Sequence, residues 1–315
     1  MTISQRRDRL RLRLAEAELD AMLVSDLVNV RYLSGFTGSN AALLIFADTD
    51  TPMLATDGRY RTQAAQQAPD AEVVIERACG AHLAERAGAA GVRRLGFESH
   101  VVTVDALTAL THAAGENCTL TRAPGMVEAL REVKDAGEVA LLRLACEKAD
   151  AALQDLVERG GLRAGRTEKD VRNELEALML EHGADGASFE TIVATGANSA
   201  IPHHRPTDAV LAAGDLVKID FGALVAGYHS DMTRTFVLAP AAQWQRDLYD
   251  LVATAQRAGR EALAPGVSLK DVDAASRQVI ADAGYAENFG HGLGHGVGLQ
   301  IHEAPGINAA AAGTL

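Results

Sequence analysis

The spacing of apolar residues in the first 125 positions changes repeatedly between that of a helix and that of a strand. Leu10 and Leu14 stand among charged residues at the spacing of an amphipathic helix over 4–17, and helical composition returns at 59–67 and 82–88. Short apolar runs that predict strands lie between them, at 21–25, 41–47, 51–56, 72–76, 92–97 and 119–122. This alternation predicts an α/β domain.

A break at Pro124-Gly125 separates this region from a different pattern. Residues 127–159 are rich in helix-forming side chains, with only Gly137 interrupting them, and 167–182 predicts a second helix. That second helix begins with Thr167 and Asp170 at the spacing of a capping box. Beyond Gly183 the chain consists of short strand-like runs. We therefore predict two domains, residues 1–126 and 127–315.

The segment 217–237 reads as a β-hairpin that carries two aspartates. Alternation points Val217, Ile219 and Phe221 towards a core, and a turn at 225 and 226 would place Asp220 directly opposite Asp231. Carboxylates that close repel each other unless a proton or a cation lies between them. A divalent ion bound by both carboxylates would turn this repulsion into a metal site, and the hairpin alone leaves open the alternative of a shifted register with two surface aspartates.

Histidines gather in two further segments. The run GHGLGHGVGLQIH, Gly290–His302, has too many glycines for a good helix, so we expect an extended backbone. In a strand, His291 and His295 would face one way and His302 the other, so the three need not meet at one ion. His203 follows Pro202 in a second, proline-bounded loop, which is a weaker signal taken alone.

Composition limits the classes of function. The formal net charge of −12 disfavours a nucleic acid or an anionic membrane as a partner. Three widely separated cysteines, with no CxxC, suit a reducing cytoplasm. We also expect neither a membrane-spanning segment nor a signal peptide, because no apolar run is long enough.

Taken together, these segments resemble the metallopeptidase family that holds aminopeptidase P, prolidase and methionine aminopeptidase. The resemblance is carried by five segments in the family's order: Leu130-Arg131 with Lys134, Pro202-His203, GDLVKIDFG at 214–222, YHSDMTRTF at 228–236, and Gly290–His302. YLSGFTGS at 32–39 and TDGRY at 56–60 resemble the domain that precedes catalysis in the creatinase and Xaa-Pro branch. Methionine aminopeptidases normally lack that domain and creatinase lacks the aspartates, so the Xaa-Pro branch is favoured.

The resemblance implies an α+β protein: a C-terminal pita-bread catalytic domain after an N-terminal α/β creatinase-type domain. It implies that Asp220, Asp231 and His295 bind two divalent ions, with manganese preferred over zinc or cobalt. His203, His291 and His302 would bind substrate and move protons. The expected substrate is a peptide with proline at its second position, and the expected assembly is a homodimer. Dipeptides and longer peptides remain alternatives.

One departure from the family pattern concerns two glutamates. The family places them beyond the histidine run, and Glu303 does not stand at either place in the motif. We expect that the sequence is truncated before these ligands, and that the 315-residue form binds metal weakly and is nearly inactive. The alternative is a non-catalytic homologue that uses the same cleft to bind peptides or proteins.

Overall fold

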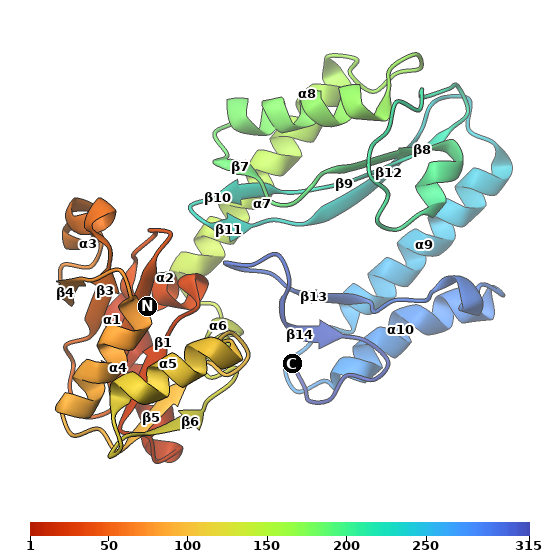
Figure 1. Ribbon diagram of the computed structural model, residues 1–315. Helices are drawn as coiled ribbons and strands as arrows, with labels where there is room; N and C mark the ends of the chain where they lie inside the picture. Colours follow the sequence, from red (N-terminus) through yellow and green to blue (C-terminus); the bar gives the residue numbers. More distant parts are fainter. The chain divides into compact units, whose positions relative to one another are not determined.

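The chain divides into two units, which the computed structural model describes over residues 1–315 (Figure 1). One unit spans Met1–Asp135 and the other Ala136–Leu315. The boundary that we predicted after residue 126 differs from this division by nine residues. Residues 127–135 belong with the first unit because they hydrogen-bond to it: Arg131 donates to the Asn29 amide oxygen, and Arg6 pairs with Asp135 at 2.9 Å.

A six-stranded mixed sheet forms the centre of the first unit, in the order β4-β3-β2-β1-β5-β6. The pairs β1/β2 and β2/β3 are antiparallel, and the other neighbours are parallel. The strands are β1 (Ala21–Val24), β2 (Ala41–Phe46), β3 (Met53–Thr56), β4 (Glu72–Ile75), β5 (Arg94–Phe97) and β6 (Thr119–Arg122). All six lie where apolar runs predicted them.

Six helices surround this sheet or lead from it, and two of them were not predicted. These two are α2 and α5; α2 begins because Asp26 caps it, accepting from the Val28 and Asn29 amides, and ends at Gly35 with φ of 80°. The helices are α1 (Ile3–Glu16), α2 (Leu27–Ser34), α3 (Arg61–Gln67), α4 (Cys79–Ala89), α5 (Val104–Ala114) and α6 (Glu128–Arg131). The predicted helix over 127–159 is in fact two helices, α6 and α7 (Ala136–Glu158), and the unit boundary lies between them.

In the second unit, α7 and α8 (Glu168–Glu181) pack against two small antiparallel sheets. The shared core joins Leu156 of α7 and Leu175 of α8 to Val217, Ile219 and Phe221, all buried, as the alternation predicted. The first sheet has the order β11-β10-β7 and the second β12-β9-β8. The strands are β7 (Gly186–Ala187), β8 (Ile192–Thr195), β9 (Leu216–Phe221), β10 (Ala223–Val225), β11 (Tyr228–His229) and β12 (Met232–Val237).

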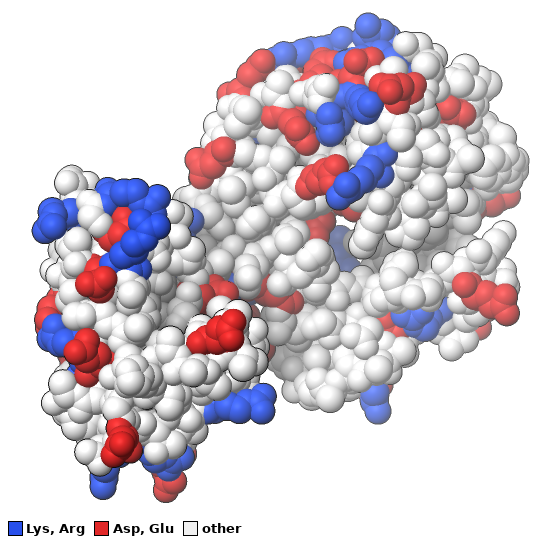
Figure 2. All heavy atoms as spheres, viewed as in Figure 1, with Lys and Arg blue, Asp and Glu red and all other residues white.

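The rest of the second unit consists of two helices and a short hairpin. Helices α9 (Gln243–Glu261) and α10 (Leu269–Asp282) pack on each other, and α10 also contacts β14 (Glu303–Ile307), which pairs with β13 (Gly294–Gly296). No helix is long and apolar enough to cross a membrane. On the face drawn in Figure 2, basic and acidic side chains are interspersed, so that face offers no broad positive field for a nucleic acid.

Gly222 bends the long hairpin between its two sheets. Strand β9 ends at Phe221 and β10 begins at Ala223, and a Cβ atom on Gly222 would lie 1.8 Å from the Ser230 carbonyl oxygen. On the other side of the bend, Ser230 Oγ accepts from the Ala223 amide at 2.9 Å. Only glycine lets the two backbones approach this closely, and Asp231 follows immediately after the bend.

We expect Gly222→Ala to destabilise the protein by at least about 3 kcal/mol, because backbone rather than a movable side chain occupies the space. Urea unfolding measures the loss. Gly186→Ala, on the neighbouring strand β7, is the matched control, since its Cβ would meet nothing within 4 Å, and it should change stability by less than about 1 kcal/mol. Equal effects of the two substitutions would contradict the close approach at Gly222.

Candidate active site

One cavity of about 330 Å³ in the second unit collects most of the residues singled out from the sequence. Asp220 and Asp231 line it, and so do His203, His295 and His302. His291 does not line it. The cavity therefore brings together five of the six predicted site residues, from the Asp hairpin, the proline-bounded loop and the histidine–glycine run.

The two aspartates share a face of the hairpin, although not in the register that we predicted. The turn residues are Ala226 and Gly227, with φ of 47° and 79°, one position later than predicted. Asp220 consequently lies opposite Thr233 rather than opposite Asp231. The predicted direct pair is wrong, because moving a two-residue turn by one position shifts the register by two. A shift of two keeps both carboxylates on one face, so they still reach the same cavity.

Asp220 carries an unsatisfied oxygen. Its Oδ1 atom is buried and has no hydrogen-bond partner. Burial raises the pKa of Asp220, a hydrogen bond from Thr233 opposes the rise, and the charge of Asp231 adds to it. A buried carboxylate oxygen without a donor is costly, and a cation is the partner that would relieve it.

His295 presents one ring nitrogen to Asp231. Its Nδ1 atom lies 2.9 Å from the Gly296 carbonyl oxygen and donates to it, which leaves Nε2 as the ring nitrogen that faces Asp231. That Nε2 lies 3.4 Å from Asp231 Oδ2. An imidazole nitrogen and a carboxylate oxygen are both common ligands of divalent metals, so a metal ion could be shared by this pair.

The histidine run folds back on itself instead of forming one strand. Only Gly294–Gly296 is a strand, with a bulge after His295, and the returning chain brings the His302 ring to 4.5 Å from the His295 ring, between centroids. The prediction that His302 faces away from His295 is therefore wrong. His291 is exposed, packs edge-on against Phe289 and hydrogen-bonds the Gly292 carbonyl oxygen, so its expected role stays a prediction.

The donors fit a divalent ion in their chemistry, but they do not yet form a closed ligand set. No group of three or more His, Cys, Asp and Glu side chains converges as it would around a metal. Two carboxylates, one of which carries the unsatisfied Asp220 oxygen, and the His295 imidazole all line the same cavity. This donor set suits a hard or borderline divalent cation.

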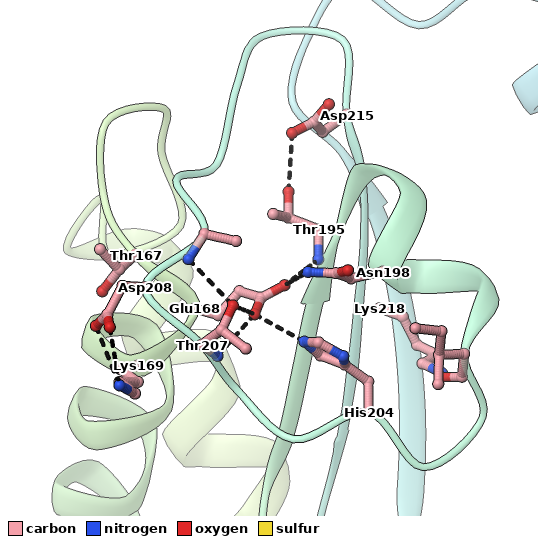
Figure 3. Close-up of polar contacts among 12 residues, drawn as sticks. Thr167, Glu168, Lys169, Thr195, Asn198, His204, Thr207, Asp208, Asp215 and Lys218 are labelled. Atoms are coloured by element: carbon pink, nitrogen blue, oxygen red, sulfur yellow. Dashed lines mark hydrogen bonds and ion pairs between the residues drawn. The ribbon is translucent and has the colours of Figure 1, made fainter.

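Glu168 and His204 were not predicted as site residues. Glu168 is fully buried at the start of α8, and its carboxylate accepts from His204 Nε2 at 2.8 Å, from the amides of Thr195 and Thr207, and from Asn198 (Figure 3). His204 in turn lines the cavity. No sequence pattern marks a glutamate in a first helical turn as buried; the neighbouring histidine pair was the only available signal.

The hydrogen bonds keep Glu168 ionised. Burial alone would raise its pKa, but the bonds from His204, Asn198 and the two backbone amides outweigh burial and lower the pKa to about 2. A carboxylate whose pKa falls on folding stabilises the folded state above its unfolded pKa and loses that contribution as the pH falls through the folded value. Glu168 therefore stabilises the protein most at neutral pH.

We expect Glu168→Gln to lower the free energy of unfolding at pH 7 by on the order of 3 kcal/mol. The difference in free energy of unfolding between Glu168→Gln and the wild type should narrow as the pH falls from 4.5, the ordinary pKa of a glutamate, towards about 2. Urea unfolding at pH 7, 4 and 3 measures it. Glu181→Gln, at the exposed end of the same helix, should stay within about 0.5 kcal/mol of the wild type. If Glu168→Gln lowered the free energy of unfolding as much at pH 3 as at pH 7, the lowered pKa of Glu168 would be refuted.

Comparison with known proteins identifies a family for both units. Residues 140–315 match the model of metallopeptidase family M24, and residues 6–133 match the creatinase/prolidase N-terminal domain. The chain belongs to the M24 metallopeptidase family. It thus has the pita-bread catalytic domain and creatinase-type N-terminal domain expected from its sequence, and M24 membership implies divalent metal ions.

Relatives of this M24 peptidase match it along nearly its whole length. It is 35% identical over 312 residues to the peptidase YqhT of Bacillus subtilis, covering 98% of this chain and 86% of the relative. It is 31% identical over 300 residues to a Xaa-Pro dipeptidase of Pyrococcus horikoshii, covering 92% and 80%.

Solved structures are similar as well. A Xaa-Pro dipeptidase from Bacillus anthracis has a TM-score of 0.93 at 35% identity, covering 100% of this chain and 87% of that chain. An X-Pro aminopeptidase from Thermotoga maritima has a TM-score of 0.89 at 33% identity, covering 98% and 86%.

Proposed function

We propose that this M24 peptidase is a two-metal exopeptidase that hydrolyses Xaa-Pro peptide bonds. The observation that carries the proposal is that Asp220, Asp231 and His295 line one cavity, together with His203 and His302. Relatives and structural neighbours at 31–35% identity bear the names Xaa-Pro dipeptidase and X-Pro aminopeptidase, which supports the choice of bond.

In this proposal, Asp220, Asp231 and His295 hold the metal ions. Divalent ions in such a site polarise the scissile carbonyl and make water nucleophilic at neutral pH. The hydrogen bond from His295 Nδ1 to the Gly296 carbonyl keeps that proton in place and leaves Nε2 free to act as a ligand. His203 and His302 line the same cavity and are proposed to bind the peptide and exchange protons with it, and His291 is proposed for the same task on resemblance alone.

Three finer points belong to the same proposal. Manganese is the proposed metal, by resemblance. An oxygen-rich donor set with one imidazole suits manganese, and it suits zinc or cobalt as well. The proposed site of action is the cytoplasm, in keeping with the free Cys79, Cys118 and Cys146. The proposed assembly is a homodimer, by resemblance.

The test compares peptides with the product of the complete reading frame that contains these residues, loaded with Mn²⁺. We expect hydrolysis of an Ala-Pro dipeptide or an Ala-Pro-Ala tripeptide, and at least about 10²-fold slower hydrolysis of Ala-Ala and Ala-Ala-Ala. The ratio of dipeptide to tripeptide turnover separates prolidase from aminopeptidase P activity. Binding of Ala-Pro without any turnover would overturn the proposal and favour the non-catalytic homologue.

A further inference from the structure

The loop that carries His203 is fixed by residues on either side of that histidine. Apart from a short 3₁₀ turn, η2 (Gly196–Ala200), the chain between β8 and β9 is irregular. His203 lines the cavity. Its neighbours in the chain are both held: the Pro202 carbonyl oxygen accepts a hydrogen bond from a lysine, and the His204 ring binds a glutamate. The position of the His203 ring therefore depends on the contacts that fix Pro202 and His204.

On one side the anchor is Glu168. Its carboxylate accepts five hydrogen bonds between residues 195 and 207, so it ties the end of β8, the middle of the loop and the far side of the loop to the start of α8. The donors are the Thr195 amide at 2.9 Å, Asn198 Nδ2 at 3.0 Å, His204 Nε2 at 2.8 Å, and the Thr207 amide and Oγ1, both at 2.8 Å. Figure 3 shows this convergence, with His204 pointing from its loop to the carboxylate.

On the other side the anchor is Lys218. Its Nζ atom donates to the carbonyl oxygens of Ile201 at 2.5 Å and Pro202 at 3.0 Å. Lys218 lies on β9, two residues before Asp220, so the strand that carries a proposed metal ligand also holds the backbone just before His203. The loop is thus fastened to a helix through Glu168 and to the metal-ligand strand through Lys218.

From these contacts we infer that Glu168, His204 and Lys218 are positioning residues that hold the His203 imidazole against the substrate. The inference rests on the proposed function, in which His203 contacts the peptide. A loop without these anchors would sample many backbone conformations, and ordering it would oppose substrate binding and chemistry. Misplacing a substrate-contacting group by about 1 Å can cost about 10²-fold in rate.

The closing experiment is a double-mutant cycle between His204 and His203. His204→Phe keeps a ring but removes the donor to Glu168, and we expect kcat/KM for Ala-Pro to fall about 10–100-fold. In a His203→Ala background the same substitution should cost less than about 3-fold, because the group it positions is gone. His204→Gln, which keeps an N–H donor, should recover part of the loss.

A histidine on the surface provides the matched control. His182 Nε2 makes a comparable bond to Asp155 Oδ2 at 3.0 Å away from the cavity, so His182→Phe should leave kcat/KM unchanged. Equal losses from His204→Phe in both backgrounds would overturn the inference, since they would show that His204 does not act through His203.

A readout without turnover separates this inference from the proposed function. In ¹H–¹³C spectra of the histidine rings, we expect the His203 Cε1–H resonance, assigned with His203→Ala, to be sharp in the wild type. It should broaden or shift in His204→Phe and stay unchanged in His182→Phe. An unchanged His203 resonance in His204→Phe would overturn the positioning role. A wild type that hydrolyses no Xaa-Pro peptide would instead overturn the proposed function, and the spectra would still decide the positioning role.

Discussion

Replacing Asp231 by asparagine should lower kcat/KM for Ala-Pro by at least about 10³-fold in the product of the complete reading frame. Asp231 lies at the bend after β11, 3.4 Å from His295 Nε2, on the cavity face that also holds Asp220. Asparagine keeps the shape but loses the charge that balances a divalent ion. Steady-state kinetics with saturating Mn²⁺ measures the loss, and calorimetry should show weakened Mn²⁺ binding.

The control for this substitution is Asp247→Asn. Asp247 is exposed on α9, accepts a hydrogen bond from Gln243 and does not line the cavity. Its replacement should leave kcat/KM within about 2-fold of the wild type. Retention of wild-type turnover by Asp231→Asn would remove Asp231 from the reaction and with it the proposed ligand set.

Stripping the metal should abolish hydrolysis without unfolding the protein. The core between α7, α8 and strands β9 and β10 is apolar and lies apart from the cavity, so it does not need an ion to form. After dialysis against 1,10-phenanthroline and EDTA, we expect activity to fall by at least about 10²-fold and the circular dichroism spectrum to stay unchanged. Added Mn²⁺ should restore activity and raise the melting temperature.

Elemental analysis of the dialysed sample confirms that the metal has gone. Full turnover in a sample shown to be free of metal would rule out a metal-dependent reaction. Loss of the folded spectrum on dialysis would instead show that the ion supports the fold, which the position of the apolar core argues against.

Much of the fold was predictable from local pattern. All six strands of the first unit are short apolar runs, and α8 begins directly after Thr167 because the Thr167 hydroxyl and Asp170 form the predicted capping box. Helices α2 and α5 were not predicted because turn-forming or β-branched residues stand near their starts. Hydrogen bonds to the capping side chains of Asp26 and Thr103 determine where these two helices begin. The break between α6 and α7 was missed because tertiary pairing, such as Arg6 with Asp135, overrides helix propensity there.

The candidate site was predictable in membership but not in geometry. The turn was predicted one residue too early, but Asp220 and Asp231 were still correctly predicted to lie on one face, because a register shift of two preserves the side of the sheet. The position of His302 was missed because the chain reverses after His295, and no pattern in a glycine-rich run marks that reversal. Glu168 was missed because its burial depends on a loop that returns more than 25 residues later, in donors such as His204 and Thr207.

The central claim is that Asp220, Asp231 and His295 hold divalent metal at the cavity. Anomalous diffraction from a crystal of the complete protein soaked in Mn²⁺, recorded on both sides of the manganese absorption edge, tests it most directly. The account predicts anomalous peaks within ligand distance, about 2.0–2.4 Å, of the two carboxylates and of His295 Nε2. Peaks confined to other parts of the molecule, or an empty cavity at saturating Mn²⁺, would contradict it.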